Sequence, residues 1–216
     1  FRGTASLKNM LTDCSAWRTC PNDFGEHGTP GLLRSRGVYI HAGFWSAYLS
    51  IRQEMLDNIL PALNPEVKDL RSPSSNDGPP AIIMTGHSLG GALALLAALD
   101  MSTLESHQGL EIGCITFGQP RVGNRQFAKL VDEKIKALIR IVYERDLVTG
   151  QPSIPMLFKH TEAEAVVDDK GNCIPKPSFV EKTFMGSKTS FEAHSMKKYL
   201  DAYNANVALI NKLYTN

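Results

Sequence analysis

Long apolar runs are absent from this sequence. None reaches the ~18 residues that a membrane-spanning helix requires, so we expect no transmembrane segment. An excess of one charge is absent as well, because the sequence has 23 Lys and Arg and 22 Asp and Glu, a formal net charge of +1. This balance argues against a nucleic-acid partner and against a strongly acidic substrate. Histidines and cysteines at the spacing of a zinc site are also lacking, so the sequence predicts neither a metal nor another cofactor.

Cysteine is scarce, and its four copies do not define a disulfide framework. Cys14, Cys20, Cys114 and Cys173 allow three complete pairings. Cys14 and Cys20 are close enough in the chain for a small local bridge. Cys114 lies in an expected core strand and is better interpreted as a buried free thiol. The cysteines leave the compartment open, with secretion and peripheral membrane attachment as the two alternatives.

The chain has 216 residues, the size of one domain, and we expect a single domain over residues 1–216. A chain of this length buries roughly 70% of its unfolded surface, so its core needs neither a metal nor a disulfide. Residue 1 is Phe rather than Met, and Phe1–Thr4 resembles the end of a strand. We therefore expect an N-terminally incomplete or processed chain. The oligomeric state is not fixed by the pattern.

Apolar periodicity predicts strands that alternate with helices. Buried strands are expected at 81–85, 112–117 and 138–143, and a short strand at 38–40. Helices with one apolar stripe are expected at 44–59, 124–135 and 196–214, and short strand-like pieces between 153 and 181. The order of strand, helix, strand, helix and strand predicts parallel pairing through right-handed crossovers, and so an α/β fold.

Residue types at the ends of these segments predict their boundaries. The helix at 44–59 should end at Pro61, and Asn124 should cap the helix that follows it. The stretches 21–37 and 71–80 are rich in turn-forming residues and are expected to be loops.

One stretch, Gly86-His87-Ser88-Leu89-Gly90-Gly91, joins the strand at 81–85 to an apolar helix at 92–99. A buried strand, a glycine-rich turn and a buried helix form the nucleophile elbow of α/β-hydrolases, in which the serine points out above the sheet. The pattern Gly-x-Ser-x-Gly by itself is weak evidence, because it also arises by chance. In those proteins its serine is only a hydroxyl in a loop. Its two flanks favour Ser88 as a nucleophile. The start of the helix behind it supplies free N–H groups for an oxyanion.

A serine nucleophile needs a base, and histidine suits because it titrates near working pH. His194 is the best candidate: it precedes the last helix and is the final histidine, in the chain order serine, acid, histidine. The alternative for His194 is a helix cap, and His160 is the reserve base. His87 adjoins the serine, but neighbouring side chains at an elbow are expected to point apart. His41 is interpreted as a structural hydrogen-bonding residue.

The acid of the expected triad should follow a strand that lies between the serine and the histidine. Asp146 comes three residues after the strand at 138–143, at the carboxyl edge of the sheet, where it would fix the histidine tautomer. Glu144 is closer to the strand and is expected to turn away. The oxyanion donors are expected to be the backbone N–H of Leu89 and a group of the Gly3-Thr4 turn.

Five blocks of residues resemble the class 3 (fungal-type) lipase family, in the family's order and over nearly the whole chain. They are Phe1-Arg2-Gly3-Thr4, His41-x-Gly43-Phe44, Gly86-His87-Ser88-Leu89-Gly90-Gly91-Ala92, Phe117-Gly118-x-Pro120-Arg121-Val122-Gly123-Asn124 and Arg145-Asp146. The resemblance implies an α/β-hydrolase fold, a mostly parallel sheet with helices on both faces, and hydrolysis of lipid esters such as triacylglycerols. It implies Ser88 as nucleophile, Asp146 as acid, His194 as base and Thr4 as the second oxyanion residue.

The resemblance also implies a mobile lid at residues 6–13, whose apolar stripe is Leu7, Met10 and Leu11. Such a lid would expose an apolar face at an oil–water or membrane interface. The alternative for this stripe is ordinary packing on the domain. The expected partner is a lipid ester at such an interface.

Three features depart from the family. The family's Asp-x-Val-Pro is Asp146-Leu147-Val148-Thr149 here, and its His-x-Gly is His160-Thr161-Glu162. The family also has a helix and strands before Phe-Arg-Gly, so N-terminal strands of the sheet are expected to be missing. Alternative functions with the same triad are a phospholipase A1, a galactolipase or a feruloyl-type esterase. A catalytically inactive lipid-binding homologue would lack a triad residue, and none is missing.

Overall fold

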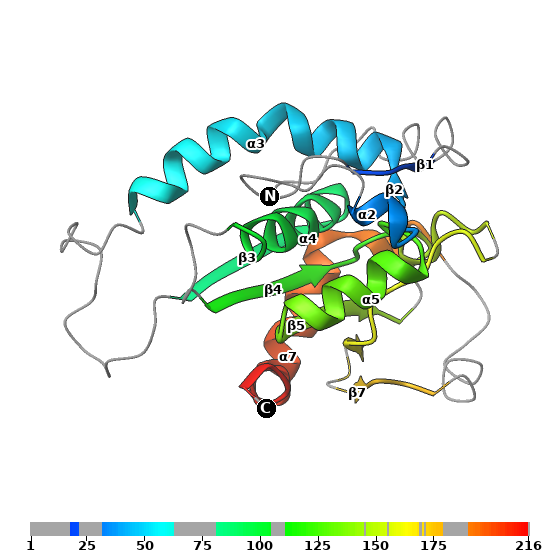
Figure 1. Cartoon of the computed structure of the whole chain (residues 1–216). Helices are drawn as coiled ribbons and strands as arrows, with labels where there is room; N and C mark the ends of the chain where they lie inside the picture. The colour runs from blue at the N-terminus through cyan, green and yellow to red at the C-terminus, as the bar shows by residue number, and fades with distance from the viewer. Residues whose placement is uncertain are drawn as a thin grey trace.

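The computed structural model describes residues 18–21, 32–62, 81–104, 111–144, 146–154, 156–168, 170, 172–178 and 190–215. The elements are β1 (Arg18–Thr19), α2 (Leu32–Ser35), β2 (Ile40–His41), α3 (Ala42–Ala62), β3 (Ala81–His87), α4 (Leu89–Met101), β4 (Glu111–Phe117), α5 (Arg125–Lys134), β5 (Ala137–Tyr143), η3 (Val148–Gly150), β6 (Glu164–Val167), β7 (Cys173–Pro175), η4 (Glu192–His194) and α7 (Met196–Thr215). Figure 1 shows their arrangement around one central sheet.

The central sheet has five strands in the order β3-β4-β5-β6-β7. The first four strands run parallel, and β7 pairs with β6 in the antiparallel direction. Parallel pairing in strict chain order brings the carboxyl ends of β3, β4 and β5 to one edge of the sheet. The loops that leave this edge carry Ser88, Gly118 and Asp146. A separate two-stranded antiparallel ribbon pairs β1 with β2.

Alternation along the strands gives the sheet two apolar faces, each covered by helices. Ile112, Cys114 and Leu138 belong to the core beneath α3, α4 and α5. On the opposite face Ile141 and Ala165 pack with α7. Successive side chains of a strand point to opposite faces, so the central strands β4 and β5 contribute to both cores. In Figure 1, α4 lies between α3 and the sheet, and α7 lies behind the sheet.

A buried polar contact fixes α3 on α4. Asp100, which is fully buried near the end of α4, accepts hydrogen bonds from the Tyr48 hydroxyl at 2.6 Å and from Arg52 Nε at 2.5 Å. Burial, and then the charge of Asp100, raise the pKa of Tyr48 far above its ordinary value, so its phenol remains a donor. A buried carboxylate with two such donors is satisfied.

The predicted alternation of strands and helices is present, and the structure corrects the ends of some elements. The helix expected at 44–59 is α3, which begins at Ala42 and continues one residue past Pro61, because a proline in the last turn removes only one hydrogen bond from the ladder. The stretch 21–37, expected to be a loop, contains the short helix α2. The strand expected at 38–40 is β2 at Ile40–His41. Asn124 caps α5 as expected, because its side chain accepts from the N–H of Phe127 at 3.0 Å.

The cysteines of the described ranges are free thiols. Cys20 is a free thiol, and Cys14, its possible partner in a local bridge, lies outside the described residues. Cys114 is a fully buried thiol in β4, as the sequence predicted. Burial raises its pKa to about 12, which keeps it protonated and unreactive.

Within the part of the chain that the structure describes, none of the helices combines the length and apolar character required to cross a membrane.

Candidate active site

Ser88 occupies the sharp turn between β3 and α4. Its backbone is strained, with φ of 61° and ψ of −128°, and the residue is 3% exposed. Gly86 makes this turn feasible, because a Cβ atom at that position would lie 2.2 Å from the carbonyl oxygen of Gly90. The hydrogen bond from the N–H of Ser88 to the carbonyl oxygen of Phe117 holds the turn against the end of β4. The turn has the geometry of a nucleophile elbow.

Ser88, His194 and Asp146 are joined by two short hydrogen bonds, although they lie far apart in the chain. His194 Nε2 is 2.6 Å from Ser88 Oγ, and His194 Nδ1 is 2.7 Å from Asp146 Oδ2. An ionised carboxylate can only accept, so the ring proton lies on Nδ1 and Nε2 is left to accept from the serine hydroxyl. In this arrangement the imidazole can remove the proton of Ser88.

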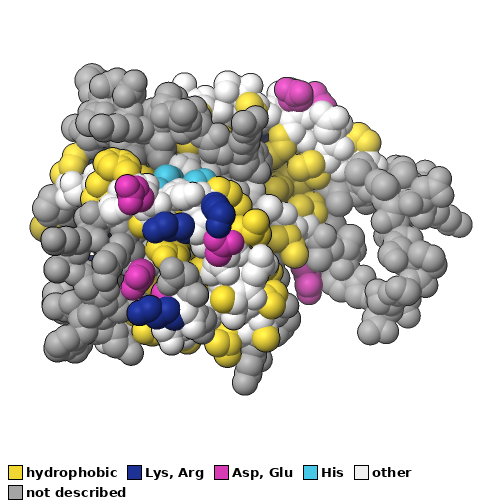
Figure 2. Space-filling model, turned by 180° about the vertical axis from the view of Figure 1, so that it is seen from behind, with side chains coloured by type: hydrophobic (Ala, Val, Ile, Leu, Met, Phe, Trp, Pro, Cys, Tyr) yellow, Lys and Arg dark blue, Asp and Glu magenta, His cyan; other side chains and the backbone are white. Residues whose placement is uncertain are grey.

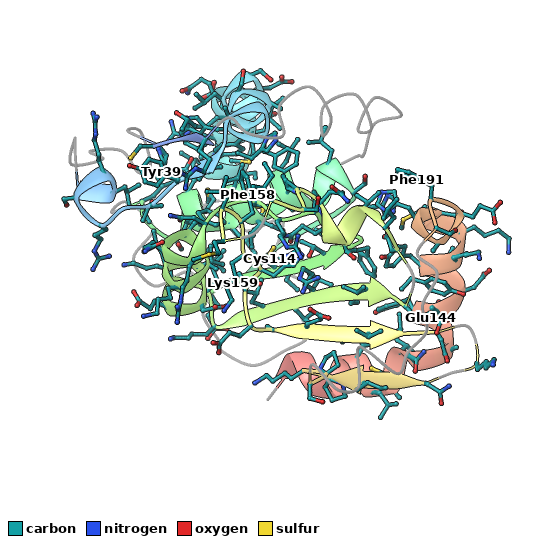
Figure 3. All side chains as sticks on the ribbon, turned by 90° about the vertical axis from the view of Figure 1, so that its right-hand side faces the viewer. Tyr39, Cys114, Glu144, Phe158, Lys159 and Phe191 are labelled. Atoms are coloured by element: carbon teal, nitrogen blue, oxygen red, sulfur yellow. The ribbon has the colours of Figure 1, made fainter. Side chains whose placement is uncertain are left out.

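Two loops that meet at the sheet edge place the acid and the base. Asp146 follows β5 and forms a β-bridge with Ser190, which precedes the turn η4 that ends at His194. The Ser190 side chain accepts from the N–H of Ala193 at 3.2 Å and so shapes that turn. Figure 3 shows Phe191, on this turn, and Glu144, after β5, at the arrowhead end of the strands next to α7.

The carboxylate of Asp146 is enclosed and fully hydrogen-bonded. Its side chain has no exposed surface, and Oδ1 accepts from the N–H of Val148 at 2.8 Å. Oδ2 accepts from the Tyr199 hydroxyl at 2.6 Å in addition to the His194 ring. The sequence placed Tyr199 only on the inward stripe of the last helix. No signal in the sequence separates Tyr199 from an ordinary core residue, because its contact with Asp146 depends on the path of α7.

Gly118 is packed against Asp146 and His194. Its φ is 58°, and a Cβ atom at this position would lie 2.9 Å from Asp146 Oδ2 and 3.0 Å from His194 Cε1. Glycine is therefore required here for two reasons, a left-handed backbone and the lack of space beside the hydrogen bond between acid and base.

Gly118→Ala should lower the kcat/KM for ester hydrolysis by roughly 100-fold, because the added methyl group pushes the imidazole and the carboxylate apart. Steady-state kinetics on a soluble ester measures the loss. Gly37→Ala is the matched control: it has the same left-handed backbone, at φ of 66°, but nothing lies within 4 Å of its Cβ position. Gly37→Ala should lose stability and keep its activity. Equal kinetic losses in the two variants would contradict the packing argument.

His87 lies against the base, which the sequence analysis did not foresee. The ring centroids of His87 and His194 are 4.5 Å apart with the planes inclined by 31°, and the ring of Tyr199 meets His87 edge-on at 5.5 Å. The expectation that the side chain of His87 points away from the site is wrong. The reason is that His87 shares the sheet face with α7, onto which the loop of His194 folds. Burial, and then the positive charge of His194, lower the pKa of His87 to about 4.

The low pKa of His87 makes the stability of the fold depend on pH. Between pH ~6.5 and ~4 the unfolded chain binds a proton at His87 and the folded chain does not, so the free energy of unfolding falls as the pH falls. Because His87 is partly exposed, solvent screening reduces the effect to about 1–2 kcal/mol. Urea unfolding at pH 7 and pH 4.5 should show a smaller difference for His87→Gln than for the natural sequence. An equal difference in both proteins would refute this linkage.

The remaining predicted residues lie elsewhere or outside the described ranges. His160, the reserve base, hydrogen-bonds through Nε2 to the carbonyl oxygen of Thr149 at 2.7 Å and not to Ser88. His41 Nδ1 accepts from the N–H of Phe44 at 3.4 Å, which fits a structural role. Thr4 and the apolar stripe of the expected lid, Leu7, Met10 and Leu11, lie outside the described residues. The described residues contain no cluster of three His, Cys, Asp or Glu side chains suited to a metal ion.

The surface around the site is partly apolar. Phe191 and Met196, on either side of His194, are 52% and 50% exposed. Figure 2, seen from the side that carries α7, shows histidine atoms at the surface with apolar and charged side chains close by. An apolar surface beside a polar reacting centre suits a substrate with a long hydrocarbon part.

Comparison with known proteins relates this site to a family of enzymes. The family model "Lipase (class 3)" matches residues 1–156. The chloroplastic phospholipase A(1) DAD1 of Arabidopsis thaliana is 36% identical over 155 residues, which cover 71% of this chain and 33% of that protein. A lipase of Rhizomucor miehei is 32% identical over 172 residues, which cover 78% of this chain and 41% of the relative. The chain thus spans about a third to two fifths of the length of these relatives.

Solved structures show the same fold. A triacylglycerol lipase, described as having a serine-protease triad as its catalytic centre, superimposes with a TM-score of 0.68 at 27% identity, over 90% of this chain and 68% of that one. The lipase of Rhizopus microsporus var. chinensis gives 0.67 at 28% identity, over 90% and 62% of the two chains. The fold is therefore that of the α/β-hydrolases, as expected. The family match extends over more than half of the residues, and the protein belongs to the class 3 lipase family.

Proposed function

We propose that this protein hydrolyses carboxylic esters of lipids through a triad of Ser88, His194 and Asp146. The observation that carries the proposal is the continuous hydrogen-bonded path from the serine hydroxyl through the imidazole to a buried carboxylate. Membership of the class 3 lipase family supports the same chemistry. The proposed reaction needs no cofactor, because the serine hydroxyl itself attacks the ester.

The reaction follows from the positions of these groups. Ser88 Oγ attacks the ester carbonyl while His194 Nε2 takes its proton, and the resulting imidazolium is stabilised by Asp146. The tetrahedral intermediate collapses to an acyl-enzyme when His194 returns the proton to the leaving alcohol. A water molecule, activated by the same imidazole, then releases the fatty acid and restores the serine.

The oxyanion of the intermediate needs donors close to Ser88. Leu89 is the first residue of α4, so its backbone N–H has no partner within the helix and is free to donate. The resemblance to the class 3 lipase family implies Thr4, through its backbone, as the second oxyanion residue, and Thr4 lies outside the described residues. The half-exposed Phe191 and Met196 beside the base favour contact with a lipid surface.

The kind of lipid separates two candidate functions. The similar solved structure described as a triacylglycerol lipase favours triacylglycerol, and the phospholipase A(1) of Arabidopsis thaliana, at 36% identity, favours the sn-1 ester of a phospholipid. Emulsified triacylglycerol, phosphatidylcholine vesicles with distinct acyl chains at sn-1 and sn-2, and a soluble short-chain ester should be compared as substrates. Release of the sn-1 chain as the fastest reaction would support the phospholipase.

A fluorophosphonate probe tests the hydrolase itself, because it reacts only with an activated serine. We expect one equivalent of label on Ser88 of the intact, folded protein. Folded protein that takes no label and cleaves none of the three substrates would exclude the hydrolase and leave a lipid-binding homologue.

A further inference from the structure

The carboxylate of Asp146 accepts three hydrogen bonds, and two of them reach the same oxygen. His194 Nδ1 and the Tyr199 hydroxyl lie 2.7 Å and 2.6 Å from Oδ2. The N–H of Val148 occupies Oδ1 at 2.8 Å. The phenol of Tyr199 therefore acts on the same atom that orients the base.

The direction of the phenol's hydrogen bond is fixed by a third residue. The backbone N–H of Tyr143, at the end of β5, donates to the Tyr199 oxygen at 3.0 Å. A hydroxyl has a single proton, and both the position of this N–H and the carboxylate's need for a donor direct that proton to Asp146. Burial, and then the charge of Asp146, raise the pKa of Tyr199 well above its usual range, so the proton is retained.

The ring of Tyr199 is held by packing on every side that the structure describes. The residue is fully buried on α7, and its ring meets those of His87, Phe117 and Tyr143 at 5.5, 6.3 and 6.2 Å in edge-on contacts. A side chain locked in this way gives its hydroxyl a fixed place. It can therefore hold another group at a set orientation.

Building on the proposed hydrolysis, we propose that Tyr199 is a positioning residue that fixes the Asp146 carboxylate for His194 and shares its negative charge. Without the hydroxyl, Oδ2 has one donor fewer and the carboxylate can rotate about its Cβ–Cγ bond. The charge that the phenol now stabilises would then act more strongly on the imidazole. The imidazolium form of His194 becomes more favourable, so the ring stays protonated to a higher pH. The ring is also oriented less precisely toward Ser88.

Tyr199→Phe removes only this hydroxyl and keeps the ring. The acid limb of the pH profile of kcat/KM should move upward by about 0.5–1 pH unit, and kcat at its plateau should fall by roughly tenfold. The matched control is Tyr203→Phe, one turn later on α7, which loses the same atom while its ring keeps its edge-on contact with Phe117. The control should keep the natural profile.

A second variant separates tuning from structural damage. Placing 3-fluorotyrosine at position 199 alone keeps the size of the ring but makes the phenol a stronger donor. The acid limb should then move to lower pH, opposite to the shift of Tyr199→Phe. A loss of packing gives no such pair of opposite shifts. The fluorinated protein also decides the question if Tyr199→Phe does not fold.

The titration of the His194 ring by NMR in the resting protein gives a readout that needs no turnover. The midpoint should rise in Tyr199→Phe and fall in the fluorinated protein. If both variants fold and titrate as the natural protein does, within about 0.2 pH unit, the positioning role is refuted. A natural protein that hydrolyses no ester would remove the proposed function, and the NMR midpoints would still decide the role of Tyr199.

Discussion

Ser88→Ala should lower kcat for ester hydrolysis by on the order of 10⁵–10⁶-fold, as the loss of a nucleophile does in other triads. The substitution removes the one oxygen that His194 Nε2 contacts at 2.6 Å. Alanine has the same Cβ as serine, so the strained backbone at φ of 61° is no harder to form and the fold should persist. Substrate binding should change little, so the loss appears in kcat. Pre-steady-state and steady-state rates on a soluble ester measure it.

Ser50→Ala is the control for this variant. Ser50 lies on the exposed face of α3 and donates only to the carbonyl oxygen of Ala47, one turn earlier. Its loss should leave kcat within about twofold, in line with a surface substitution. Activity of Ser88→Ala within tenfold of the natural protein would remove Ser88 from the proposed role. Fluorophosphonate labelling of that variant would lead to the same conclusion.

Much of the sheet could be predicted because its central strands, β4 and β5, bury apolar side chains on both faces. Apolar runs separated by one fully apolar helix, α4, and one amphipathic helix, α5, specify β3, β4 and β5 and their parallel order. The cap at Asn124 was predictable for a local reason, since the hydrogen bond spans only three residues. Boundaries were less certain, and the short α2 was missed, because four residues carry too little periodicity.

The side chains that surround the base could not be predicted in the same way. The contact of His87 with His194 depends on how the loop before α7 folds across the sheet, and the two rings come from residues 107 positions apart, 194 − 87. Tyr199 has the pattern of an ordinary core residue, and only the three-dimensional path of α7 brings its hydroxyl to Asp146. Local patterns predict elements, whereas such contacts depend on tertiary packing.

Asp146→Asn should lower kcat by about 10⁴-fold, the size of effect that follows removal of the acid of a serine-hydrolase triad. The amide can be oriented in two ways. With its NH₂ toward His194, it meets Nδ1 as a donor and drives the ring proton to Nε2, where the ring can no longer accept from Ser88. With its NH₂ toward Val148, it opposes the backbone N–H that now donates to Oδ1 at 2.8 Å. Neither orientation carries the charge that stabilises the imidazolium.

The donor set around Asp146 decides between these orientations. Oδ2 receives two donors, Tyr199 and His194, and Oδ1 receives only one. The amide oxygen should therefore remain at the Oδ2 position, so the ring keeps its tautomer and the loss comes mainly from the missing charge. Asp168→Asn, in the turn before β7, is the control and should leave kcat unchanged, because its carboxylate serves only Lys170 and Asn172. A loss below tenfold in Asp146→Asn would mean that another carboxylate supports the base.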